Sequence, residues 1–165
     1  MQKNSRGFTL IEVLIVIGIL GIVLALAAFV FLREQQVQQL RAAQTQLATD
    51  IERARSLARR YSYNYRFTIN YSTGAYIARA LDNSNAVVTT APAVTGRLPN
   101  PIKLLSTVPT STGSFSVVYS GPFGRMQGSA ASSMRIGFGS AAGQLKTSVD
   151  MIGVTGQVIR RGISE

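Results

Sequence analysis

The chain has 165 residues, with 17 basic and 7 acidic side chains, a formal net charge of +10, and neither cysteine nor histidine. Without these two residue types it has no disulfide framework, no thiolate metal site, and none of the imidazole groups that most often act as bases or ligands. No other arrangement of catalytic side chains is visible, so we expect no enzyme activity, no metal and no cofactor. The length suits one folded domain in addition to whatever the N-terminal segment forms.

The N-terminal segment joins a short basic stretch to a long apolar run. Residues 1–7 read MQKNSRG, and residues 8–32 are apolar with few exceptions. As a helix, this run would be about 37 Å long, enough to cross a bilayer core of about 30 Å. Lys3 and Arg6 favour a cytoplasmic N-terminus. We therefore expect a single-pass inner-membrane protein with its remaining residues outside the cytoplasm.

One carboxylate, Glu12, interrupts the apolar run. An ionisable side chain within a membrane helix is costly, and such residues usually have a function. The alternative is that Glu12 lies close enough to the start of the helix to stay in the interfacial zone.

The stretch from Arg6 to Leu14, RGFTLIEVL, resembles the prepilin processing motif of type IV pilins and type II secretion pseudopilins. The resemblance implies that a prepilin peptidase cleaves between Gly7 and Phe8, and that Phe8 is then N-methylated. It also implies that Glu12 pairs with the N-terminal amine of a neighbouring pilin during assembly, as a buried carboxylate needs a charged partner. The chain has no proline before position 92, so the resemblance does not extend to the proline kink of many major pilins.

Helical character continues over residues 33–60, which contain neither glycine nor proline. Apolar residues recur there at three- and four-residue spacing, which predicts that one face of the helix packs on a sheet. This stripe consists of Leu40, Ala43, Leu47, Ile51, Ala54 and Ala58.

After Tyr61 the pattern changes to the alternation typical of strands. Two alternating stretches, 65–69 and 75–79, flank a turn and predict a hairpin, whereas 82–101 and 124–133 are predicted to be loops. Further strands are predicted at 102–108, 114–120, 134–138, 145–152 and 156–161. The predicted fold class is α+β, with a long N-terminal helix, first membrane-spanning and then amphipathic, packed on an antiparallel β-sheet domain. The predicted division is a leader at 1–7, a transmembrane half-helix at 8–32, an amphipathic half-helix at 33–60 and a β-rich domain at 61–165.

Within pilin-like proteins, the chain most resembles the GspH/FimT group of minor pilins and pseudopilins. The resemblance is carried by Ala54 to Ala58 running into Tyr61 to Phe67, by Gly137-Phe138-Gly139, and by the ending from Gly156 to Arg161. It implies a minor pilin, a structural and assembly subunit that joins other pilins and reaches the pilus or cell surface. The alternative is a type II secretion pseudopilin of the GspH type.

Arginines crowd the predicted end of the helix and the first strand, interleaved with tyrosines. They are Arg53, Arg55, Arg59, Arg60 and Arg66. Arginine neutralises phosphates and tyrosine stacks on bases, so this composition suits nucleic acid. The alternatives are a solvated basic helix end, with the tyrosines packed into the sheet, and a basic face close to anionic lipid.

A second basic pair, Arg160 and Arg161, lies near the C-terminus. Some FimT-like minor pilins bind DNA during natural transformation through basic residues in this region. The resemblance therefore implies double-stranded DNA as a further partner. It is partial, because Gln157 stands where a basic residue would strengthen it.

Overall fold

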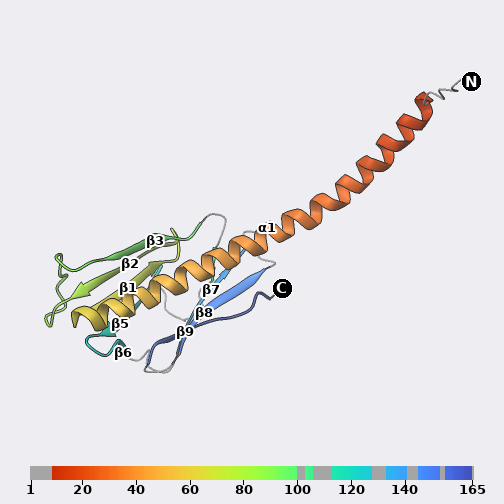
Figure 1. The fold of residues 1–165 in the computed structure, drawn as a ribbon. Coiled ribbons are helices and arrows are strands. Elements are labelled where there is room, and N and C mark those ends of the chain that lie inside the picture. The colour runs from red at the N-terminus through yellow and green to blue at the C-terminus, as the bar shows by residue number, and fades with distance from the viewer. Residues whose placement is uncertain are drawn as a thin grey trace, which may run out of the picture. The chain divides into compact units, whose positions relative to one another are not determined.

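The computed structural model describes residues 9–99, 103–105, 113–127, 133–140, 145–152 and 155–164, apart from a few of their side chains. The predicted leader and Phe8 lie outside these ranges. The chain divides into two compact units, Met1–Gln36 and Val37–Glu165. Helix α1, Leu10–Tyr61, contributes its first part to the one unit and its second part to the other (Figure 1).

The second part of α1 carries the predicted apolar stripe. All six of its residues, from Leu40 to Ala58, are fully buried. They follow the helical repeat, so they lie on one face, while charged residues such as Arg41 and Arg53 lie exposed on the other. The predicted amphipathic helix is confirmed.

One antiparallel sheet has five strands in the order β3-β2-β1-β5-β6. Its strands are β1 (Asn64–Asn70), β2 (Ala75–Leu81), β3 (Val94–Arg97), β5 (Ser114–Ser120) and β6 (Arg125–Gln127). Burial alternates along β1, so Tyr65, Phe67 and Ile69 face the core while Arg66 faces solvent. The predicted hairpin is confirmed as β1 and β2, which pair directly.

A second antiparallel sheet has four strands in the order β4-β7-β8-β9. Its strands are β4 (Lys103–Leu105), β7 (Ser133–Gly139), β8 (Lys146–Ile152) and β9 (Gln157–Arg160). They correspond to four predicted strands, although residues 102 and 106–108 of the first prediction are outside the described ranges. The chain therefore leaves the five-stranded sheet to form β4, returns for β5 and β6, and ends in the four-stranded sheet.

Two strands were predicted to be loops. β3 lies within 82–101 and pairs with β2, and β6 lies within 124–133 and pairs with β5. Both are short edge strands whose sequences, VTGR and RMQ, contain little alternation of apolar and polar residues. They are strands because they pair with β2 and β5, and not because their own sequences alternate between apolar and polar residues.

The core is one apolar cluster that unites α1 with both sheets. Figure 1 shows the second part of α1 lying along the two sheets. A buried amide, Gln44, fixes one of these contacts, because its Nε2 donates to the carbonyl oxygens of Ser148 at 2.9 Å and Arg161 at 2.7 Å. The fold is therefore α+β, a pilin-like arrangement of one long N-terminal helix on antiparallel sheets, as predicted.

Tyr65 and Tyr119 are cross-strand partners in the core, and both are fully buried. The Tyr65 hydroxyl donates to the Pro92 carbonyl oxygen at 3.0 Å, whereas the Tyr119 hydroxyl has no partner among the described residues. A buried hydroxyl without a partner has lost its bonds to water for nothing in return. We predict that Tyr119→Phe leaves the free energy of unfolding unchanged or raises it by up to about 1 kcal/mol, whereas Tyr65→Phe lowers it by about 1 kcal/mol.

Urea titrations of the full chain in detergent measure both changes. Each variant controls for the other, because both remove one hydroxyl from the same buried row. Equal destabilisation by the two substitutions would contradict the prediction.

Candidate functional site

The candidate assembly site lies at the start of α1. The Thr9 carbonyl oxygen accepts bonds from the backbone N–H groups of Glu12 at 3.1 Å and Val13 at 3.3 Å, which close the first helical turn. Glu12 lies in this turn with its side chain exposed. Thr9 and Glu12 have the spacing of a capping box, so a local role for the carboxylate exists beside the predicted one. Gly7 and Phe8, the predicted processing residues, are outside the described residues.

The apolar part of α1 has no cover of its own. Every described side chain from Leu10 to Leu32 is exposed, and the most apolar window of 18 residues has a mean hydropathy of 3.2 with no share of it buried. By length and composition this helix could cross a membrane. So much exposed apolar surface requires lipid or other helices around it.

The arginines at the end of α1 do not form one group. Arg53, Arg59 and Arg60 are exposed, and the Arg60 guanidinium lies 5.6 Å from the centre of the Tyr61 ring. Arg55 is instead part of the fold: its Nε donates to the Gly124 carbonyl oxygen at 3.1 Å, and its Nη1 lies 3.3 Å from a Glu52 carboxylate oxygen. Three of the four helix arginines are therefore available to a partner.

Arg66 lies elsewhere, on the exposed face of β1. Its neighbour Tyr65 points the opposite way into the core, because successive residues of a strand alternate between faces. Tyr61 and Tyr63 are exposed. Of these three tyrosines, only Tyr61 and Tyr63 could stack on a ligand. The arginines and tyrosines that are adjacent in sequence are therefore divided between the helix end and the two faces of a sheet.

Arg160 and Arg161 also point to different places. The Arg160 Nη1 donates to the Thr45 hydroxyl oxygen on α1 at 3.2 Å, whereas the Arg161 Nε donates to a carboxylate oxygen of Asp150 at 2.9 Å. Arg135 binds the same carboxylate through two bonds, at 2.8 and 3.0 Å. Both C-terminal arginines are thus engaged within the fold.

The Asp150 carboxylate is almost fully buried beneath its two arginines, with a side-chain exposure of 6%. Burial favours its neutral form, but the hydrogen bonds from Arg135 and Arg161 outweigh burial and hold the pKa of Asp150 below its ordinary value. A hollow of about 390 Å³ opens beside this cluster, lined also by Gly137 and Lys146. The cluster keeps a net positive charge, because two guanidinium groups pair with one carboxylate.

Residues 2–28 match the family model described as the prokaryotic N-terminal methylation motif. The chain carries a prepilin-type N-terminus. No curated protein and no solved structure matches it. The match includes Gly7, Phe8 and Glu12, and it ends within the apolar part of α1.

The prepilin-type motif explains the uncovered helix. It supports a type IV pilin-like prepilin, that is, a pilin or pseudopilin in general, and it implies processing by a prepilin peptidase and assembly with other pilins. Together with the exposed apolar residues, it indicates membrane anchoring. Proteins of this kind are structural subunits, and no cluster of metal-binding side chains occurs among the residues that the structure describes.

Sequence reasoning missed three polar residues that join different segments of the domain. Gln44, Glu52 and Asp150 are polar side chains whose partners lie more than ten positions away or on another element. No short motif marks such residues. Asp150 is an acid within a predicted strand. Its ion pair with Arg135 can be inferred only once the pairing register of β7 and β8 is known.

We predict that Asp150→Asn lowers the free energy of unfolding by about 2 kcal/mol at neutral pH, because the bonds to Arg135 and Arg161 lose their charge assistance. The sign of the pH dependence follows from the lowered pKa of Asp150. The stabilisation is complete above the ordinary pKa of 3.8 and is lost as the pH falls through the lower folded-state value.

Urea titrations between neutral pH and about pH 2 would measure this dependence. The difference between the wild type and Asp150→Asn should shrink at the acidic end. Asp82→Asn is the control, since the half-buried Asp82 carboxylate accepts its hydrogen bonds within its own turn and not from an arginine. The Ser84 hydroxyl holds the pKa of Asp82 below its ordinary value, so this control should show a weaker dependence of the same sign. A difference that stays constant across the range would refute the role of the charge.

Proposed function

We propose that this chain is a minor pilin of the GspH/FimT kind, a structural and assembly subunit of a type IV pilus system. One observation carries the proposal: a prepilin-type motif leads into an uncovered apolar helix that contains a single carboxylate, Glu12. The two-sheet domain packed on the second part of α1 supports it, because a filament subunit needs a folded body to cover the helical bundle from outside.

The assembly step follows from electrostatics. Cleavage between Gly7 and Phe8 leaves a positively charged amine at Phe8, four positions before Glu12. A carboxylate in an apolar filament core requires a cation, and the amine of the neighbouring subunit supplies one. The exposed apolar side chains of α1 exchange lipid for the helices of other subunits in the same step.

The proposed topology divides the chain as the sequence predicts. Residues 1–7 form the leader, 8–32 span the inner membrane, 33–60 form the amphipathic half-helix and 61–165 form the extracytoplasmic domain. Lys3 and Arg6 hold the leader on the cytoplasmic side, where the peptidase acts. After assembly the domain lies on the pilus or at the cell surface.

The alternative is a type II secretion pseudopilin of the GspH type, with the same processing and the same use of Glu12. The two proposals predict different effects of deleting the gene for this chain. Deletion should abolish pili in the first case and release of secreted enzymes in the second.

A second candidate function is the binding of double-stranded DNA for uptake. The net charge of +10 and the exposure of Arg53, Arg59 and Arg60 favour it, as phosphate contacts dominate non-specific DNA affinity. Of the other predicted contacts, Arg66 is exposed, whereas Arg55, Arg160 and Arg161 are engaged within the fold.

We predict that co-expression with a prepilin peptidase yields a chain that begins at Phe8 and carries one added methyl group. Mass spectrometry of the intact protein measures both changes. A chain that retains residues 1–7 beside an active peptidase would refute the pilin proposal.

We predict that Glu12→Ala is processed normally but enters filaments at least tenfold less, because the amine of the neighbour loses its partner; a buried charge left alone costs about 3–5 kcal/mol. Immunoblots of sheared filaments and of membranes measure the distribution. Glu34→Ala is the matched control, as it removes one carboxylate from α1 beyond the apolar run. Equal incorporation of both variants would contradict the role of Glu12.

A further inference from the structure

The outer face of the five-stranded sheet carries two arginines side by side. Arg66 on β1 and Arg79 on β2 are cross-strand partners, and both are exposed. Side chains at directly opposite positions have Cβ atoms about 5 Å apart, and like charges there are destabilising. The fold therefore bears an electrostatic cost in the middle of the sheet that a neutral residue at either position would avoid.

No acid on this sheet offsets the pair. The five strands contain neither Asp nor Glu, and within the described chain neither arginine makes an ion pair. The nearest acid in sequence is Asp82, which directly follows β2. Its carboxylate accepts bonds from the Ser84 hydroxyl and the backbone N–H groups of Ser84 and Ala86. That carboxylate is committed to its own turn.

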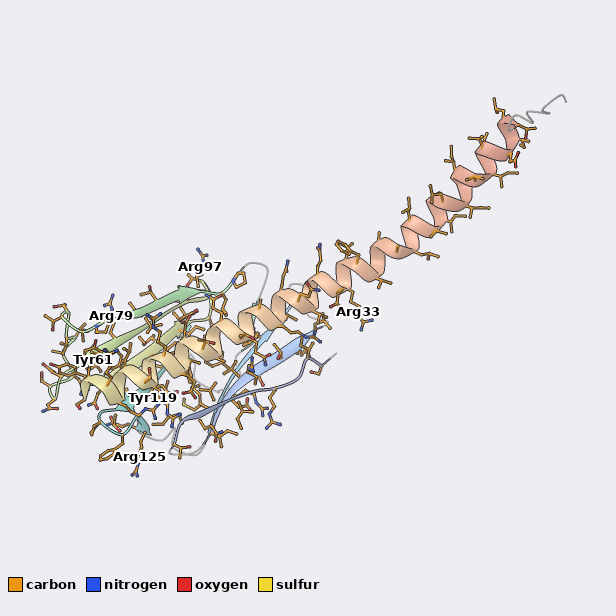
Figure 2. All side chains as sticks on the ribbon, in the orientation of Figure 1. Arg33, Tyr61, Arg79, Arg97, Tyr119 and Arg125 are labelled. Carbon is orange, nitrogen blue, oxygen red and sulfur yellow. The ribbon has the colours of Figure 1, made fainter. Side chains whose placement is uncertain are left out.

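Two more arginines extend the positive face. Arg97 ends β3 and its Nε donates to the Thr73 carbonyl oxygen at 3.1 Å, while Arg125 begins β6 and lies 5.5 Å from the centre of the Phe123 ring. Figure 2 labels both, together with Arg79, on the strands of this sheet. Basic side chains thus occur from one edge strand to the other.

The outward residues between the arginines are mostly hydroxyl side chains, together with two half-buried apolar residues, Ile77 and Val118, of which Val118 lies opposite Arg66. Thr68, Thr95 and Ser116 form one outward row of the sheet, in which Ile77 is the apolar member. Protein interfaces have an apolar or aromatic centre, whereas DNA interfaces are more polar and much more positive. Hydroxyl groups beside arginines are typical donors to phosphate oxygens. The composition of this face therefore favours a nucleic acid over an acidic protein.

The aromatic residues of the five strands all face inward. They are Tyr65, Phe67, Tyr76, Phe115 and Tyr119, and all are buried. Binding of single strands relies on exposed aromatic side chains on which the bases stack. Within its five strands this basic face presents no such side chain, and the exposed Phe123 ring beside it lies against Arg125 at one edge. The face therefore fits the phosphate backbone of a duplex better than it fits a row of stacked bases.

We propose that the outer face of the five-stranded sheet, centred on Arg66 and Arg79, binds the phosphate backbone of duplex DNA without regard to sequence. The inference rests on the DNA-binding candidate function above and locates its main contact. It centres the contact on Arg66 and Arg79, flanked by Arg97 and Arg125, instead of on the C-terminal arginines, of which Arg161 is already paired with Asp150.

The test measures binding of the full chain, in zwitterionic detergent, to a labelled short duplex across a salt series. Each phosphate neutralised adds about 0.9 to the slope of log affinity against log salt. Arg66→Ala/Arg79→Ala should lower this slope by about 2 and weaken binding at about 50 mM salt at least tenfold. Arg66→Lys/Arg79→Lys should retain most of the slope.

Two controls remove positive charge elsewhere, and the second removes as much as the test variant. Arg41→Ala removes one exposed arginine from α1, and Arg160→Ala/Arg161→Ala removes two from the C-terminal region. Both should leave the slope nearly unchanged. The Arg66/Arg79 double alanine variant should also melt at the wild-type temperature or above it, because it relieves like-charge repulsion, so its loss of binding cannot come from unfolding.

The outcomes are distinguishable. If the wild type does not bind duplex at low salt, the DNA-binding candidate function fails and this inference fails with it. If the wild type binds, but the slope falls only for Arg160→Ala/Arg161→Ala, the candidate function stands and this location is wrong. Equal binding to vesicles of anionic lipid, lost in the same Arg66/Arg79 variant, would overturn the assignment to nucleic acid.

Discussion

Everything in the second unit depends on one apolar face of α1 that serves two sheets at once. Six residues from Leu40 to Ala58 are fully buried, and the core that they join contains side chains from both sheets. Neither sheet has a second layer of helices among the described elements. Since each sheet buries its inner face against the same helix, a defect in this stripe affects both.

Polar contacts determine where each sheet lies along the helix. Gln44 donates to the carbonyl oxygens of Ser148 and Arg161, whereas Asp50 accepts a bond from the Tyr76 hydroxyl at 2.5 Å. The first contact belongs to the four-stranded sheet and the second to the five-stranded sheet. Apolar packing alone tolerates sliding, because it has no direction, but these bonds hold only at one position. Burial and the Asp50 carboxylate raise the pKa of Tyr76, so its hydroxyl remains a donor.

The sequence was sufficient to predict the long helix, its buried stripe, the hairpin of β1 and β2, and the prepilin-type N-terminus, since each has a local period or motif. It was not sufficient for β3 and β6, which are strands only because β2 and β5 lie beside them. The basic surfaces were predicted least well. Strand register places Arg79 beside Arg66. Arg55 and Arg161 are instead bonded to Gly124 and Asp150, so they are not part of the basic surface. Spacing along the chain reveals neither arrangement.

The bond between the Val158 N–H and the Glu52 carboxylate, 3.2 Å long, has a consequence for how copies of this protein meet. β9 is an edge strand, and an edge strand whose amides are open invites a foreign strand to pair with it. The Val158 N–H already donates to the Glu52 carboxylate on α1, so it cannot donate to a strand added from another molecule. In the proposed filament, where subunits assemble through their helices, an edge strand with an occupied amide would limit competing assembly through the sheet.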